Sequence, residues 1–154
     1  MLQILLVDDE RDALEALEWK LNNYIDNVEV KTCDSPLKAI DIINQEKPDV
    51  VFLDIQMPEM DGFAMIEKLE NRDFNLIFTT AHDEFALKAI KVSAIDYLLK
   101  PVDKDELLAS MEKIKKSSHV RILLACIKIR RQNQRSKKFR ATVARKSQIS
   151  FYSQ

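Results

Sequence analysis

Glycine is almost missing from this sequence of 154 residues, since Gly62 is its single copy. Collagen-like, glycine-rich and turn-dense all-β chains are therefore excluded, because each depends on many glycines. Hydrophobic residues make up 46% of the chain, which excludes wholesale disorder. We expect a folded chain in which helices are plentiful.

Cysteine is also scarce. Cys33 and Cys126 stand far apart, with neither a CxxC motif nor a histidine pair nearby. This spacing indicates neither a disulfide framework nor a zinc site, and it favours reduced thiols in the cytosol.

Long apolar runs and a basic leader are absent. The longest uninterrupted apolar stretch near the C-terminus is Ile122–Ile127, far short of the roughly 18 residues of a membrane span. The N-terminus has no basic start and meets acid at Asp8, unlike a signal peptide. We expect a soluble cytoplasmic protein without membrane contact.

Acidic residues are missing from the last part of the chain. Residues 1–119 carry 25 acidic and 14 basic groups, a formal charge of −11, whereas residues 120–154 carry 10 basic groups and no acid, a charge of +10. The overall charge of −1 hides this division. It predicts a domain boundary near residue 118.

Short apolar runs alternate with helical periodicity over residues 1–116, which is typical of βαβ units around a parallel sheet. The expected strands are Gln3–Val7, Val28–Cys33, Val50–Leu53, Leu76–Phe78 and Ile95–Leu99. In the second strand we expect Val28, Val30 and Thr32 to point inward, as in an edge strand. The pattern predicts an α/β fold of type (βα)5.

Apolar residues at helical spacing fill the intervals between these strands. The second helix is expected to begin at Ser35 as cap and Pro36 in the first turn. The five helical faces are marked by Leu14, Leu17, Leu21 and Tyr24; by Leu37, Ile40 and Ile43; by Phe63, Ile66 and Leu69; by Phe85, Ala86, Ala89, Ile90 and Val92; and by Leu107, Leu108, Met111 and Ile114.

Beyond Ser117 and Ser118 the character of the chain changes. Residues 119–138 form an apolar, then basic segment that predicts a connector helix and linker. Residues 139–154 contain two short strand-like runs. Because a lone hairpin is marginally stable in water, we expect these residues to open a β-rich domain that is truncated here.

Polar residues gather where the expected strands end. In an open parallel α/β sheet, ligands bind beyond the carboxyl ends of the strands. Carboxylates that converge there repel one another unless positive charge is present, and Mg²⁺ with oxygen ligands, or a lysine, can supply it. Any one of these residues alone would be an ordinary helix cap or strand end, whereas together they indicate a site. They are Asp8, Asp9, Asp54, Thr80 and Lys100, with the backbone carbonyl of Gln56 as a further metal ligand.

Four segments occur together: VDDE, FLDIQMPEMDG, FTTAH and DYLLKP. In this combination residues 1–118 resemble the CheY-like receiver domain of two-component response regulators. The resemblance implies a flavodoxin-like, doubly wound parallel sheet with strand order 2-1-3-4-5, followed here by a C-terminal helical extension. The glycine that many members place before the fifth strand is absent. Val92-Ser93-Ala94 stands there, so the exit of the fourth helix should pack differently.

The resemblance also implies a role for individual residues. Asp54 would accept a phosphoryl group from a sensor histidine kinase, and Thr80 and Lys100 would contact the phosphoryl oxygens. Mg²⁺ would be bound by Asp9, by Asp8 partly through water, by Asp54 and by the Gln56 carbonyl. The protein would not be an enzyme beyond self-catalysed phosphotransfer and dephosphorylation.

Three further residues complete the expected switch. Tyr97 matches the aromatic residue whose inward movement accompanies activation. The Lys100–Pro101 peptide is expected to be cis. Gly62 is expected to take a backbone conformation closed to other residues.

The implied output is a homodimer through helix 4, strand 5 and helix 5, whose charged residues are Lys88, Lys91, Asp96, Asp103 and Asp105. The stretch HDEFALKAIKVSAIDYLLKPVDKDEL is most similar to receivers of the LytTR class, whose output domain is β-rich and binds DNA. DNA binding would then belong to the missing C-terminal domain. The basic tail alone would be an inert linker or would bind phosphates non-specifically.

Two other functions stay open at this point. A stand-alone receiver could signal by protein binding alone. A haloacid-dehalogenase-like phosphatase would need a second aspartate two residues after Asp54, where Gln56 stands, so this reading is remote.

Overall fold

The computed structural model describes residues 1–117, and residues 1–114 form one compact unit. Its elements are β1 (Leu2–Val7), α1 (Arg11–Tyr24), β2 (Val28–Cys33), α2 (Pro36–Glu46), β3 (Val50–Leu53), α3 (Gly62–Glu67), β4 (Asn75–Thr80), α4 (Ala86–Lys91) and β5 (Asp96–Leu99). A last helix runs over residues 104–117. The expected connector 119–138 and β-rich segment 139–154 lie outside the described residues.

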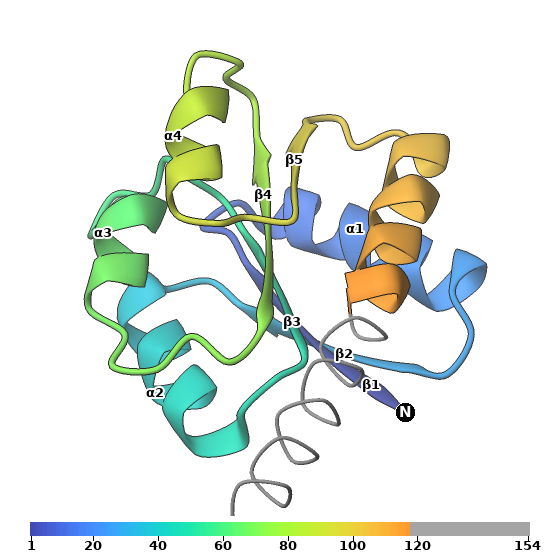
Figure 1. The fold of residues 1–154 in the computed structure, drawn as a ribbon, viewed down its shortest axis with the longest axis horizontal. Helices are drawn as coiled ribbons and strands as arrows, with labels where there is room; N and C mark the ends of the chain where they lie inside the picture. Colours follow the sequence, from blue (N-terminus) through green and yellow to red (C-terminus); the bar gives the residue numbers. More distant parts are fainter. Residues whose placement is uncertain (118–154) are drawn as a thin grey trace, which may run out of the picture. The chain divides into compact units, whose positions relative to one another are not determined.

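The five strands form one parallel sheet in the order β2-β1-β3-β4-β5. Helix α1 and residues 104–114 of the last helix cover one face, and α2, α3 and α4 cover the other (Figure 1). This is the flavodoxin-like, doubly wound fold that the sequence predicts. Because the direction of winding reverses beside β1, the carboxyl ends of β1 and β3 border a shared crevice.

Each face of the sheet has its own apolar core. Leu14, Leu17 and Leu21 of α1 pack against one side, together with Leu107 and Met111 of the last helix. The other core is formed by side chains of α2, α3 and α4 with the opposite faces of the same strands. Strands β3 and β4 are buried along their whole length, as expected for central strands covered on both faces.

Three details of the predicted pattern are wrong. Thr32 is exposed, because β2 lies at the edge of the sheet and is only partly covered. Leu37 is 52% exposed, and α2 buries Pro36, Ala39 and Ile43 instead. Ile90 is exposed, since α4 contacts the core mainly through Ala89.

Ser35 does begin α2, with Pro36 in the first turn, but its side chain makes no capping hydrogen bond. The Ser35 hydroxyl is instead 3.1 Å from a Glu59 carboxylate oxygen. Within residues 1–117, no helix has the length and apolar content that crossing a membrane requires.

Candidate functional site

The site lies where β1, β3, β4 and β5 end. The parallel hydrogen bonding continues one residue past the strands: the Asp54 amide donates to the Val7 carbonyl at 2.9 Å, and the Lys100 amide donates to the Thr80 carbonyl at 2.8 Å. The Asp8 amide likewise donates to Cys33 at 3.1 Å. The backbone thus fixes Asp8, Asp54 and Lys100 at one edge of the sheet.

The Lys100 ammonium connects the carboxylates of this edge. Its Nζ lies 2.6 Å from Asp8 Oδ2, 3.2 Å from Asp54 Oδ2 and 3.6 Å from Glu10 Oε1. Asp8 and Asp54 are each only 4% exposed, whereas the Glu10 side chain is 68% exposed. Two carboxylates therefore lie inside the site, and a third lies at its mouth.

The pKa directions describe a site that is short of positive charge. Burial raises the pKa of Asp8, and the hydrogen bond from Lys100 offsets this only in part. Burial also raises the pKa of Asp54. The charge of Lys100 lowers this pKa and the charge of Asp8 raises it, and the net result is an increase. Burial disfavours the charged form of Lys100, yet its contacts with Asp8 and Asp54 outweigh this and raise its pKa. The lysine stays protonated, and the carboxylates remain under-compensated.

The carboxylates offer a ligand set for a divalent cation. Oxygens of Asp8, Glu10 and Asp54 lie within 4.8 Å of one another. Carboxylate oxygens are the hard ligands that Mg²⁺ prefers. Within residues 1–117, the cluster sets three carboxylates against the Lys100 ammonium, so the residues present fit a divalent ion in both donor type and charge.

The clustered carboxylates are not all among the predicted metal ligands, and the predicted ligand set itself stays a prediction. Asp9 is exposed and is not among the clustered carboxylates, and Gln56 is exposed at the end of the β3 loop. Sequence reasoning missed Glu10. The Glu10 amide donates to Asp8 Oδ1 at 2.9 Å, a short-range turn that brings the chain back toward the site. An acid two residues after Asp8 was the available signal.

Thr80 and Tyr97 are linked through the main chain of His82. Thr80 is fully buried, and its hydroxyl accepts a hydrogen bond from the His82 amide at 3.3 Å. The Tyr97 hydroxyl donates to the His82 carbonyl. Tyr97 is half-buried in this conformation, and burial raises the pKa of its phenol. The two expected switch residues therefore hold the same peptide segment.

The prediction that Gly62 takes a backbone conformation closed to other residues is wrong. Its φ angle is not positive, and it is the first residue of α3. A Cβ at this position would lie 2.4 Å from the Asp54 carbonyl oxygen, and the Gly62 amide donates to Ile55 at 2.8 Å. Glycine is required because the helix begins directly against the backbone of Asp54. The Lys100–Pro101 peptide is cis, as the sequence predicts.

Several charges of the expected output surface are engaged within the chain. Asp96 Oδ2 accepts hydrogen bonds from Ser110 at 2.5 Å and Lys113 at 2.7 Å, while Asp103 Oδ1 accepts from the amides of Asp105 and Glu106. The same surface exposes large apolar side chains instead. Leu87 and Ile90 of α4 are 76% and 71% exposed, and Leu99 at the end of β5 is 44% exposed.

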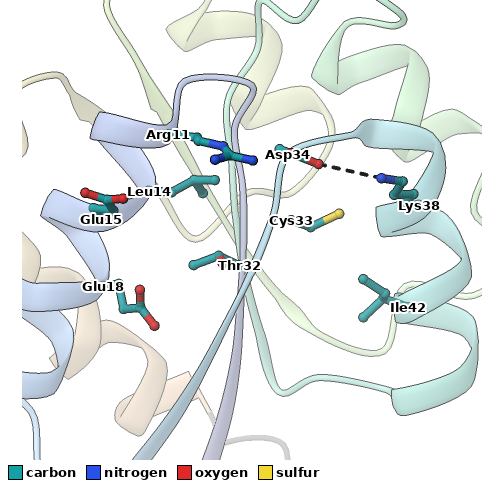
Figure 2. A pocket seen from close by; sticks show the side chains of 9 residues that line it. All are labelled: Arg11, Leu14, Glu15, Glu18, Thr32, Cys33, Asp34, Lys38 and Ile42. Carbon is teal, nitrogen blue, oxygen red and sulfur yellow. Dashed lines mark ion pairs between the residues drawn. The ribbon is translucent and has the colours of Figure 1, made fainter.

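The largest hollow described, of about 480 Å³, shares no residue with the acidic cluster. It lies between α1 and α2 at the end of β2, with Cys33 among its lining residues (Figure 2). Cys33 is buried and its thiol donates to the Ser35 carbonyl at 3.2 Å; burial raises its pKa and so disfavours the reactive thiolate. This hollow is therefore separate from the acidic cluster.

Comparison with known proteins agrees with this geometry. The sequence profile of the response regulator receiver domain matches residues 4–112. The chain belongs to the response regulator receiver family. The matched residues include Asp8, Asp54, Thr80 and Lys100.

Two individual proteins illustrate how similar this chain is to known response regulators and how much of each it matches. The transcriptional regulatory protein BtsR of Escherichia coli (strain K12) is 39% identical over 117 residues, covering 75% of this chain and 48% of BtsR. The sensory transduction protein LytT of Bacillus subtilis (strain 168) is 36% identical over 118 residues, covering 75% of this chain and 49% of LytT. The receiver therefore spans about half the length of these curated relatives.

A solved structure supports the fold. A response regulator receiver domain protein from Clostridium thermocellum superimposes with a TM-score of 0.68 at 28% identity, covering 78% of this chain and 99% of that one.

Proposed function

We propose that this receiver accepts a phosphoryl group on Asp54 from a sensor histidine kinase, with Mg²⁺, and thereby switches an output surface that controls transcription. One observation carries the proposal: the buried Asp54 carboxylate lies beside both Asp8 and the Lys100 ammonium. A buried carboxylate that is deficient in compensating charge is suited to gain a cation and a phosphoryl group together.

The chemistry assigns a task to each residue. An Asp54 carboxylate oxygen attacks phosphorus, a P–O bond to Asp54 forms, and the P–N bond of a phosphohistidine breaks. The electron pair leaves with the imidazole nitrogen, which then takes a proton. Asp8, Asp9 and Asp54 would hold Mg²⁺, with the Gln56 carbonyl as a further ligand. When bound, the metal supplies charge neutralisation at the phosphoryl oxygens.

Lys100 and Thr80 would take up the new charge. Lys100 is already within hydrogen-bonding distance of Asp54, and its protonated state suits a dianionic group. The Thr80 hydroxyl would donate to a phosphoryl oxygen and so withdraw from the His82 amide that it now accepts from. Since Tyr97 holds the carbonyl of the same residue, this change would free Tyr97 to move.

The output is inferred from relatives and from exposed apolar residues. BtsR is named as a transcriptional regulator, which supports a LytTR-type DNA-binding domain beyond the receiver. Leu87 and Ile90 on α4, beside β5, are suited to a homodimer formed on phosphorylation. The protein would act as a signalling component rather than an enzyme. A cytoplasmic location stays a prediction.

Mass spectrometry tests the proposal. Incubation with acetyl phosphate and Mg²⁺ should add one phosphoryl group, and Asp54→Asn should abolish the addition. Asp41→Asn, which changes an exposed carboxylate of α2, is the matched control and should be phosphorylated normally. Phosphorylation that persists in Asp54→Asn would rule out Asp54 as the acceptor.

A further inference from the structure

Glu10 has a position that differs from the other acids of the site. Its amide is held by Asp8, while its carboxylate extends to the solvent-exposed mouth, 68% exposed and 3.6 Å from the Lys100 ammonium. Its oxygen still lies within 4.8 Å of ligand oxygens of Asp8 and Asp54. Glu10 is therefore the most solvent-exposed of the three clustered carboxylates.

The negative charge of Glu10 has opposite effects on the two ligands of the site, the divalent cation and the anionic phosphodonor. Asp8, Glu10 and Asp54 with Lys100 give a formal charge of −2, which a divalent cation balances. Without Glu10 the remaining charge would be −1. The Glu10 carboxylate therefore attracts a cation to the site and repels a free anion that approaches Asp54.

We propose that Glu10 is a specificity-determining residue of the phosphoacceptor site: it tightens divalent-cation binding and disfavours small, free, anionic phosphodonors relative to a phosphohistidine carried by a protein. This inference rests on the proposed function. A protein donor is bound through a contact surface with its own complementary charges, so one rim carboxylate affects it less than it affects a free anion.

The reaction with a free donor makes the distinction measurable. With acetyl phosphate, an Asp54 oxygen attacks phosphorus, the P–O bond to the acetyl group breaks, and acetate leaves with the electron pair. No oxidant or further reactant is needed. The donor is an anion throughout, so its approach depends on the charge at the mouth.

The first measurement is Mg²⁺ binding to the unphosphorylated protein by isothermal titration calorimetry. Glu10→Gln, which keeps the shape and removes the charge, should weaken binding about fivefold. Glu10→Asp, which keeps the charge, should restore most of the affinity. Glu15→Gln is the matched control, an exposed acid one turn further along α1 that lines the hollow over β2. It should stay within about twofold of the wild type.

The second measurement is the rate of phosphorylation by acetyl phosphate at saturating Mg²⁺. Glu10→Gln should react about fivefold faster than the wild type. This gain in rate should shrink as the salt concentration rises toward 1 M, because the Debye screening length falls to about 3 Å. Glu15→Gln should show no gain. If Glu10→Gln matches Glu15→Gln in either measurement, or if its gain is independent of salt, the proposal is wrong.

Asp54→Asn separates this inference from the proposed function. Loss of the added phosphoryl mass in Asp54→Asn leaves the acceptor assigned, so the Glu10 variants then decide the specificity alone. If Asp54→Asn still gains the mass, the proposed function is overturned, and the specificity proposal that rests on it is overturned too.

Discussion

Asp54 and Asp96 are both carboxylates paired with a lysine, yet their environments act in opposite directions. Asp54 shares the Lys100 ammonium with Asp8 and Glu10, and its pKa is raised. Burial also opposes ionisation of Asp96, but hydrogen bonds from Lys113, Ser110 and the Tyr97 amide outweigh it and lower the pKa. Both carboxylates have a hydrogen-bond partner on each oxygen, since the Ile55 amide donates to Asp54 Oδ1 at 2.7 Å, but Asp54 shares its lysine with two other carboxylates.

The difference separates function from structure. Asp96 connects the start of β5 to the last helix, so its contacts stabilise the fold. Ionised Asp8 and Asp54 side by side lower the free energy of unfolding. The protein retains this cost at a site where a bound cation and a phosphoryl group can relieve it. Four substitutions test this contrast, taken here from the largest expected effect to the smallest.

Gly62→Ala should disrupt the backbone at Asp54, the functional carboxylate of the two. The new Cβ would lie 2.4 Å from the Asp54 carbonyl oxygen, and backbone cannot yield as a flexible side chain can. We expect a loss of about 3 kcal/mol in the free energy of unfolding, the upper end for overpacking, measured by urea denaturation. Ala64→Gly, in the same helix, controls for helix propensity and should cost about 1 kcal/mol. Equal costs would contradict the steric account.

Asp96→Asn should weaken the connection between β5 and the last helix. Loss of the charged hydrogen bonds should cost about 2 kcal/mol at neutral pH. Because the folded pKa is lowered, this stability is present above the unfolded value of 3.8 and is lost as pH falls through the folded pKa. The difference between wild type and variant in thermal unfolding should therefore shrink progressively as pH falls below 3.8.

The control for this substitution is Asp105→Asn, an exposed acid of the last helix. It should change the unfolding free energy by less than about 0.5 kcal/mol. A cost for Asp96→Asn that does not change with pH would show that packing, rather than charge, makes the connection.

Asp54→Asn should have the opposite sign. A carboxyl whose folded pKa is raised makes the fold less stable as pH rises, so removing its charge should stabilise the Mg²⁺-free protein by about 1 kcal/mol at neutral pH. Thermal unfolding at pH 7 and at pH 3 measures this, and the gain should disappear at the lower pH. Destabilisation at pH 7 would mean that Lys100 compensates Asp54 fully.

Ser93→Gly should have the smallest effect and leave both carboxylates untouched. Ser93 has φ 61° after α4, and the amides of Ser93 and Ala94 donate to Ile90 and Ala89, which is a Schellman motif. Glycine removes the Cβ penalty, so we expect a gain of about 0.5 kcal/mol in urea denaturation. Ser93→Ala should give no gain. A loss in Ser93→Gly would contradict the backbone account.

The sequence predicts the fold well because burial follows simple periods. Central strands such as Val50–Leu53 are continuous apolar runs, and Leu14, Leu17 and Leu21 recur at helical spacing. The sequence does not show which helical positions stay exposed: Leu37 and Ile90 fit a helical pattern yet face solvent. Helix α2 buries Pro36, Ala39 and Ile43 instead, and α4 buries Ala89.

The site is predictable to the level of the strand ends and no further. Asp8, Asp54 and Lys100 follow from the topology, since parallel strands end at one edge. The direction of an acid beyond the strand depends on a local turn, so spacing does not reveal that Glu10 lies with Asp8 and Asp54. Asp9 as a metal ligand stays a prediction. The requirement for Gly62 likewise arises from a long-range approach to Asp54 that spacing does not encode.

The central claim is that the Asp54 site lacks compensating charge while the Asp96 site does not. Carboxyl-carbon NMR titration of the Mg²⁺-free protein measures both in one experiment. Asp54 and Asp8 should titrate above 3.8, and Asp96 should titrate below it. If Asp54 titrates at or below the midpoint of Asp96, the account of a charge-deficient phosphoacceptor site is contradicted.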